Sequence, residues 1–293
     1  MRGITHVVPK TTVVECVCPR RVDWEWWMLV TADEHLDSQQ CQRALLARHL
    51  DQCRDRGGYH IGVGDLYDAM QGPADKRRRL SELKDEHKAT AYFDELVNDA
   101  VAFFAPYRSM LLSQSYGNHE VSVATNYGTD LTARFVHELQ MLGETPIVVA
   151  PYQGWIIVRF QYETPTGARA GSGATQIAYH HGTGAGGPVT KGTIQANRRA
   201  VLFPDAEIVL SGHIHEAWQM EYVTERIQED GAVRYSTQWH LQLPTYKTEW
   251  DTGNGWWPET GKGPRPLGGW WLRWYWSRDE SRVKLAPPVR TEQ

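Results

Sequence analysis

The sequence predicts an α/β fold with a β-rich C-terminal part, and three observations carry this prediction. An apolar run from Trp26 to Val30, a helical segment and a second apolar run, YHIGVGD, form a strand–helix–strand pattern. Two later segments repeat apolar residues at helical spacing. After His215 the chain turns to alternating and aromatic-rich segments that favour strands.

The elements follow in order along the chain. The first 23 residues are expected to form an irregular or strand-forming arm. Asp37 and Ser38 are good N-cap residues for a helix that continues to about Arg54. Apolar spacing predicts further helices over 92–104 and 131–142. Apolar and β-branched runs predict strands near 147–150, 155–162, 176–179, 206–210, 218–223, 240–243 and 270–276.

Composition indicates a soluble globular protein of one domain. The chain has 293 residues, 41% of them hydrophobic and 23% charged, with a net charge of −4. No apolar run is long enough for a membrane helix, and no secretory signal is evident. Four cysteines without CxxC spacing favour a reduced, cytoplasmic protein. We expect one domain over 1–293, with an arm (1–23), a motif-bearing core (24–216) and a β-rich completion (217–293).

Five short motifs occur at or near the ends of predicted strands. Each is weak alone, because a D-x-H tripeptide, a capping aspartate or a pair of histidines often arises by coincidence. Together they contain six of the 12 histidines, and the donors are Asp, Asn and His without thiolate, which suits Zn, Fe or Mn. The motifs are Asp33-Glu34-His35, Gly64-Asp65-Leu66-Tyr67-Asp68, Gly117-Asn118-His119-Glu120, His180-His181-Gly182 and Gly212-His213-Ile214-His215.

The spacing of residues within these motifs predicts that their side chains point to one place. Side chains two residues apart on a strand point to the same face, so Asp33 and His35 would aim at one point. Gly64 allows a tight turn that places Asp65 at the carboxyl edge of a sheet, where open α/β sheets bind ligands. The Asn118 amide oxygen is a neutral ligand for a cation, and a neighbouring histidine is available for proton transfer.

In this order, D-x-H, GDxxD, GNHE, HG and GHxH resemble the calcineurin-like metallophosphoesterase superfamily over about Asp33 to His215. The context YHHGTGAGGPVTKG is also similar to phage- and prophage-associated members. The resemblance implies a four-layer α/β/β/α sandwich with two divalent metal ions (Mn, Fe or Zn) between the sheets. The substrate would be a phosphoester, with nucleic acid or a nucleotide as candidates.

The resemblance also implies roles for individual residues. Asp33 and His35 would hold the first metal together with His215, and Asp65 would bridge both metals. Asn118 would hold the second metal, with His213 and one histidine of the HHG motif: His181 is favoured because it directly precedes the glycine, and His180 is the alternative. His119 would assist the leaving group, and Asp68 and Glu120 would orient the ligands. Two divalent ions carry a charge of +4, the Asp33 and Asp65 carboxylates carry −2 and a bridging hydroxide carries −1. The net charge of +1 that the resemblance thus implies for the centre would attract phosphate.

The second motif departs from the sequence typical of protein phosphatases of this superfamily, and this departure narrows the expected substrate class. Protein phosphatases of this superfamily typically continue the second motif as GDxVDRG, whereas here Ala69 and Met70 follow Asp68. This favours a phosphodiesterase or nuclease-like activity over a phosphomonoesterase or protein phosphatase. A catalytically silent fold that serves as a binding module is the alternative of a different class. The expected location is the cytoplasm, or the host cytoplasm if the protein is phage-encoded.

Some segments allow two interpretations. The basic run Lys76–Arg79 is either a solvated surface or a phosphate contact, with the surface favoured. The glycine-rich loop 182–187 could cradle phosphate or act as a lid. Lys191, Arg198 and Arg199, on a predicted helix, are expected at the surface. Of the 13 tryptophans, most of the C-terminal ones are expected in an aromatic core or a subunit interface, with Trp256 and Trp257 as candidates for exposed contacts with bases.

Overall fold

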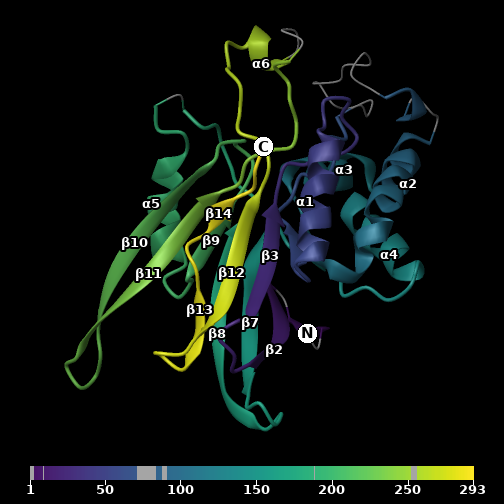
Figure 1. Cartoon of the computed structure of the whole chain (residues 1–293). Helices are drawn as coiled ribbons and strands as arrows, with labels where there is room; N and C mark the ends of the chain where they lie inside the picture. Colours follow the sequence, from purple (N-terminus) through teal and green to yellow (C-terminus); the bar gives the residue numbers. More distant parts are fainter. Residues whose placement is uncertain (1–2, 9, 71–83, 88–90, 188, 252–255) are drawn as a thin grey trace.

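Two mixed seven-stranded sheets form the centre of the protein, as the computed structural model shows (Figure 1). The structure describes residues 3–8, 10–70, 84–87, 91–187, 189–251 and 256–293. The first sheet has the order β1-β2-β7-β8-β9-β11-β10. Its strands are β1 (Gly3–Val8), β2 (Thr11–Pro19), β7 (Gln153–Glu163), β8 (Arg169–His180), β9 (Ile208–Ser211), β10 (Trp218–Ile227) and β11 (Val233–Gln242).

The second sheet has the order β13-β12-β3-β4-β5-β6, and a further strand, β14, pairs with β12. The run from β3 to β6 is parallel, so the carboxyl ends of these strands share one edge. The strands are β3 (Glu25–Thr31), β4 (Tyr59–Gly62), β5 (Leu111–Ser115), β6 (Val148–Ala150), β12 (Trp270–Ser277), β13 (Arg282–Leu285) and β14 (Val289–Arg290).

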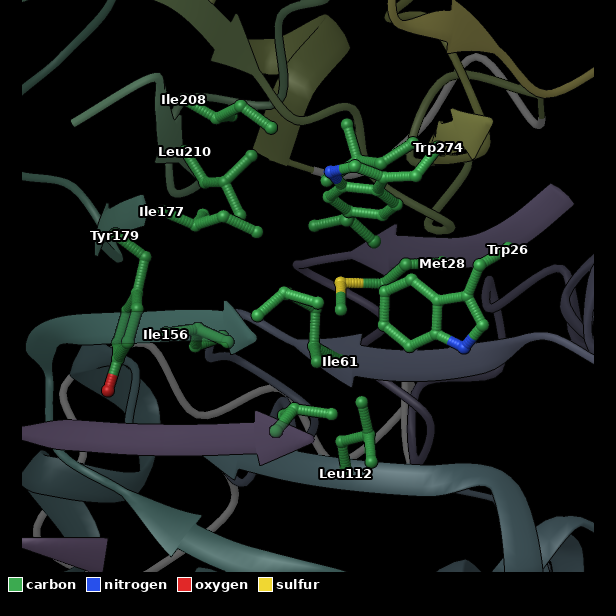
Figure 2. Packing of buried hydrophobic residues seen from close by; sticks show 14 of the residues in the cluster. Trp26, Met28, Ile61, Leu112, Ile156, Ile177, Tyr179, Ile208, Leu210 and Trp274 are labelled. Carbon is green, nitrogen blue, oxygen red and sulfur yellow. The ribbon is translucent and has the colours of Figure 1, made fainter. Parts of the chain in front are cut away.

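The largest apolar cluster contains inward-facing residues from both sheets (Figure 2). Trp26 and Trp274 meet there with ring centroids 5.0 Å apart, and Trp274 donates from Nε1 to Thr175 Oγ1 at 2.9 Å. Trp270, Trp271 and Trp276 are also buried. These C-terminal tryptophans therefore belong to the core, as the sequence favoured: Trp270, Trp274 and Trp276 pack between the two sheets, and Trp271 packs in the cluster that includes the helices.

Helices cover the outer faces of the sheets. A second apolar cluster joins the β3–β6 region to four helices, and a smaller one joins β8 and β9 to the segment at the end of α5. The helices are α1 (Arg43–Asp55), α2 (Tyr92–Phe104), α3 (Asn118–Tyr127), α4 (Leu131–Met141), α5 (Thr193–Leu202) and the short α6 (Trp256–Glu259); Asp85–His87 and Ala105–Met110 are 3₁₀ helices.

The predicted start of the first helix is wrong. The α1 helix begins at Arg43 with Gln42 as its N-cap, not at Asp37 or Ser38. The Asp37 carboxylate instead accepts from the backbone amides of Asp68 at 2.5 Å and Ala69 at 2.9 Å. Asp37 is a residue type that often caps helices, but here it joins the loop after β3 to the loop after β4. A local sequence pattern does not reveal this long-range contact.

The remaining predicted elements agree with the sequence in kind, and the strands β7, β8, β10 and β11 are longer than predicted. The β7 and β8 strands form a long antiparallel pair, and β10 and β11 form a second one. The N-terminal segment is part of the first sheet, because β2 pairs in parallel with β7 over nine residues. Among the described residues, no helix is long and apolar enough to span a membrane.

Candidate metal centre

The five motifs converge at the carboxyl ends of the central strands, and in three of them the candidate ligands have left-handed backbone conformations. Asp33 and His35 follow the end of β3 at Thr31, with φ values of 54° and 46°. His213 and His215 follow β9 in the same way, with φ values of 75° and 55°. The expectation that side-chain alternation along a strand aligns these pairs is therefore wrong, since the strands end before them. The side chains converge because the backbone turns.

Asp65 is held by an unusually close approach of two loops. It follows Gly64, whose φ of 83° lies in the left-handed region, and its own φ is 54°. A Cβ on Gly64 would lie 2.5 Å from His181 Nδ1, and one on Gly117 would lie 2.0 Å from Asp65 Oδ1. Both positions therefore require glycine for space, and the two glycines allow the metal-ligand candidates to pack together.

Glu120 joins the same two loops. Its carboxylate accepts from the amides of Gly117 at 2.8 Å, Asp65 at 3.2 Å and Tyr67 at 2.9 Å. The contact with Gly117 is also part of the cap that begins α3. Burial, and then the nearby Asp65 carboxylate, raise the pKa of Glu120 to about 7. Glu120 thus ties the turn that carries Asp65 to the loop just before Asn118, and its role in orienting metal ligands stays a prediction.

Asp33, His35 and His215 form the first group of candidate ligands. Their donor atoms lie within 4.8 Å of one another. The Nε2 atoms of His35 and His215 face each other at 3.2 Å, and His215 Nε2 lies 3.4 Å from Asp33 Oδ1. Asp33 Oδ2 accepts from the His213 amide at 2.8 Å, which ties the loops after β3 and β9 together.

Asp65, His181 and His213 form the second group, again within 4.8 Å, and Asn118 joins it. His181 Nε2 lies 3.1 Å from Asp65 Oδ2 and 3.2 Å from Asn118 Oδ1. The same Asn118 oxygen lies 2.6 Å from His213 Nδ1. Burial alone would lower the pKa of His181, but the Asp65 carboxylate raises it to about 10, which reflects how negative this environment is.

The hydrogen bonding of His181 indicates a cation site. Its Nδ1 lies 2.7 Å from the Val63 carbonyl oxygen, which can only accept, so Nδ1 carries the proton. Because the pKa of His181 is raised to about 10, the ring is protonated at neutral pH, and its Nε2 carries positive charge toward the Asp65 carboxylate and the Asn118 oxygen. This buried carboxylate and amide oxygen thus converge on a place that attracts positive charge, which a bound cation would supply in place of the proton. The residues present therefore fit a metal ion. The Val63 carbonyl oxygen would keep the proton of His181 on Nδ1, so that Nε2 is the nitrogen that faces the ion.

The adjacent histidine is placed differently. His180 is the last residue of β8, and its Nδ1 accepts from the Gly182 amide at 2.9 Å. Its ring packs against Tyr152 at 5.3 Å between centroids. Of the two alternatives that the sequence left open, the structure brings His181 and not His180 into the candidate ligand groups described above.

His119 lies beside both groups. Its Nδ1 is hydrogen-bonded to the backbone carbonyl of Asp68, and its Nε2 lies 3.7 Å from Asp65 Oδ2. Its ring is 5.0 Å from that of His35 between centroids. The Asp68 carboxylate lies 3.1 Å from His35 Nδ1 and 4.0 Å from His119 Nδ1. Asp68 therefore stands between the candidate ligand His35 and the candidate proton donor His119.

Lys247 is a functional candidate that the sequence did not reveal. Its side chain is only 2% exposed, and Nζ lies 3.0 Å from Asp68 Oδ1. Lys247 follows β11 and is separated from the GDxxD motif by 179 positions in the chain. A lone lysine in a polar segment carries no motif, and only the fold brings it to the site.

The predictions for basic residues outside the motifs are confirmed for some and wrong for others. Arg199 is buried rather than solvated, and its guanidinium is hydrogen-bonded to the Ser211 hydroxyl on β9; Lys191 and Arg198 are exposed as expected. The segment containing Lys76–Arg79 lies outside the described residues, as do the side chains of Trp256 and Trp257. Arg199 was misjudged because its helix is amphipathic and turns this residue toward the sheet.

Comparisons with known proteins add little beyond this geometry. No family model and no curated protein matches the chain. A solved structure of a predicted phosphoesterase from Streptococcus pneumoniae is 10% identical, covering 92% of this chain and 99% of that chain with a TM-score of 0.33. Zn²⁺-complexed Vps29 from Entamoeba histolytica is 10% identical, covering 90% and 98%, with a TM-score of 0.33.

GAP50 of Plasmodium, described as the anchor in the inner membrane complex, is 10% identical over 92% of this chain and 90% of that chain, with a TM-score of 0.43. Similarity at this level, with TM-scores below 0.5, carries no functional argument. The function is therefore argued from the side chains of the candidate metal centre.

Proposed function

We propose that the chain is a binuclear metal-dependent phosphoesterase that hydrolyses a phosphodiester in a nucleic acid or nucleotide. The observation that carries this proposal is the convergence of three potential ligand atoms in a buried place. His181 Nε2 lies 3.1 Å from Asp65 Oδ2 and 3.2 Å from Asn118 Oδ1. A second group, Asp33, His35 and His215, lies beside it. A four-layer α/β/β/α arrangement of the fold is part of the same proposal.

The chain's residues divide between two ion sites. Asp33, His35 and His215 would hold the first ion; Asn118, His181 and His213 would hold the second, and Asp65 would serve both. Two divalent ions, when bound, supply Lewis-acid stabilisation of charge on the phosphoester and a hydroxide nucleophile at neutral pH. Mixed carboxylate, amide and imidazole donors suit Mn, Fe or Zn.

His119 is the candidate general acid. Because Nδ1 donates to the Asp68 carbonyl oxygen, Nε2 is the nitrogen left to carry a transferable proton toward the leaving oxygen. The Asp65 carboxylate lies 3.7 Å from Nε2, and the Asp68 carboxylate lies 4.0 Å from Nδ1. The chain thus provides both an anion-attracting centre and a proton donor beside it.

A diester is favoured over a monoester by the second motif. The residues after Asp68 are Ala69 and Met70, with Ala69 buried where its amide donates to Asp37 at 2.9 Å. This position therefore offers no guanidinium to neutralise the second negative charge of a phosphomonoester. A nucleic-acid or nucleotide diester remains the substrate class to test first.

The test is hydrolysis of bis(p-nitrophenyl) phosphate by purified protein with added Mn²⁺. We expect activity that depends on the metal and is lost in Asp65→Ala and His213→Ala, whereas His180→Ala retains it. Full activity in either of the first two variants would contradict the proposal. Fewer than one bound ion per chain after reconstitution would instead favour a binding module without catalysis. A panel of single-stranded DNA, double-stranded DNA, RNA, cyclic nucleotides and phosphopeptides would then identify the substrate.

A further inference from the structure

Lys247 is a buried cation whose position is fixed by the loop after β11. Its Nζ lies 3.0 Å from Asp68 Oδ1 and also contacts the Glu249 carboxylate. The segment that carries it is tied to the first ligand loop, because Thr245 Oγ1 donates to the Asp33 carbonyl oxygen at 2.7 Å and the Tyr246 amide donates to it at 3.1 Å. The ammonium group is thus held at a defined place beside the metal centre.

The same region contains a third group of potential metal ligands. His35, Asp68 and His119 have donor atoms within 4.8 Å of one another, so spacing alone would allow an ion to bind there. This group shares His35 with the first ion site and contains the candidate general acid. An ion bound by this group would therefore remove His119 from proton transfer and compete for His35.

The ammonium group of Lys247 opposes this arrangement. It occupies the same oxygen, Oδ1 of Asp68, that faces His35 Nδ1 at 3.1 Å. A fixed positive charge at that distance repels a divalent ion and satisfies the carboxylate without one. With Oδ1 engaged in this way, Asp68 lies beside His35 Nδ1 as a fixed negative charge, and His35 Nε2 faces His215 Nε2 at 3.2 Å.

We propose that Lys247 is a positioning residue that keeps the Asp68 carboxylate beside His35 Nδ1 as a charge partner and excludes it from the metal coordination. The inference rests on the proposed function, since it concerns the same centre. A role in packing alone is poorly matched to this position, because burying a lysine costs free energy that an apolar side chain of similar volume avoids. Its two carboxylate partners, Asp68 and Glu249, offset that cost.

The experiment uses the full chain loaded with Co²⁺, whose visible spectrum reports ligand number and type. In Lys247→Met the released Asp68 carboxylate should join the coordination. We expect a changed Co²⁺ spectrum and an affinity for Mn²⁺, measured by calorimetry, that rises by about tenfold or more, the scale typical of changes to the partners of metal ligands. Lys284→Met, which removes a surface lysine paired with Glu280, is the matched control and should change neither.

A second substitution separates positioning from packing. If Lys247 acts through Asp68, then adding Asp68→Asn to Lys247→Met should return the spectrum and the affinity toward those of the wild type. A Lys247→Met protein that is indistinguishable from wild type would overturn the inference. A loss of affinity that Asp68→Asn does not recover would also overturn it, because that result indicates a packing role.

Asp68→Asn alone provides a measurement if Lys247→Met does not fold. Because Asp68 is not a ligand in this proposal, the single variant should keep two bound ions and a wild-type Co²⁺ spectrum, and a lost ion or a shifted spectrum would overturn it. The wild type separates the two proposals. If it binds Co²⁺ normally while Lys247→Met is unchanged, only the present inference fails; if it binds no Co²⁺, the proposed function fails and this inference fails with it.

Discussion

The Nδ1 atom of His181 lies 2.7 Å from the carbonyl oxygen of Val63, the residue just before the Gly64-Asp65 turn. This contact fixes the ring so that Nε2 points at Asp65 and Asn118. The backbone of one ligand loop therefore orients the side chain of another. Each metal-ligand candidate in this part of the centre depends on the correct placement of its neighbours.

Replacing the two adjacent histidines should have opposite results. We expect His181→Ala to lower the metal content from two ions toward one, because it removes a ligand of the second ion. His180→Ala should retain both ions, since its ring packs against Tyr152 outside the ligand groups. Metal analysis after dialysis measures this. Equal losses in both variants would show that the assignment of His181 is wrong.

Replacing His119 should affect the chemical step more than metal binding. For a diester with an alkyl leaving group, we expect kcat of His119→Ala to fall by about 10²- to 10⁴-fold, the contribution typical of a general acid. A p-nitrophenolate leaving group needs little protonation, so its hydrolysis should fall much less. The control is the metal content, which should stay at the wild-type value. An equal fall with both leaving groups would argue against proton donation.

Gly117 should not tolerate even a methyl group. A Cβ there would lie 2.0 Å from Asp65 Oδ1 and 2.3 Å from the Asp65 amide nitrogen. We expect Gly117→Ala to displace Asp65 and to abolish binding of at least one ion. Gly263→Ala is the control, because a Cβ there meets nothing within 4 Å. Calorimetric titration with Mn²⁺ compares the two, and wild-type affinity in Gly117→Ala would contradict the close approach of the loops.

Buried His60 should make the protein less stable in acid. Burial lowers the pKa of His60 to about 3, and its Nε2 lies 2.6 Å from Thr31 Oγ1. Above about pH 6.5 the ring is neutral in both the folded and the unfolded chain, so it adds no pH dependence. Between that pH and about 3 only the unfolded chain binds the proton, so the free energy of unfolding falls by up to about 1.4 kcal/mol per pH unit.

The variant His60→Gln should lose this contribution. We expect the free energy of unfolding, measured with urea between pH 7 and pH 4, to fall less steeply with acid than in the wild type. His137→Gln, which replaces an exposed histidine, should leave the slope unchanged. If the slope of His60→Gln matched that of the wild type, His60 would not be a neutral buried group in the folded chain.

The sequence predicted which elements form and which residues gather at the candidate metal centre better than it predicted how these residues are held. Asp33, His35, His213 and His215 lie together, as the order of the five motifs predicted, although whether they bind metal stays a prediction. The expected strand geometry at these residues was wrong, since left-handed φ values depend on tertiary contacts. Local residue type does not encode such contacts.

Long-range partners were beyond the sequence for the same reason. Lys247 reaches Asp68 across the fold, and Arg199 turns inward to Ser211 although its neighbour Arg198 is exposed. Asp37 caps no helix but joins two loops. Each of these roles depends on which segments pack side by side, and the sequence alone leaves that choice open.

The left-handed residues of the candidate metal centre lower the stability of the folded chain. Asp33, His35, Asp65, His213 and His215 all have positive φ, a conformation that costs a residue with a side chain about 1 to 2 kcal/mol relative to glycine. Glycine at any of the five would relax the backbone and delete a candidate metal ligand. The chain therefore carries a cost in stability at each of these positions, and the metal binding proposed above would account for it.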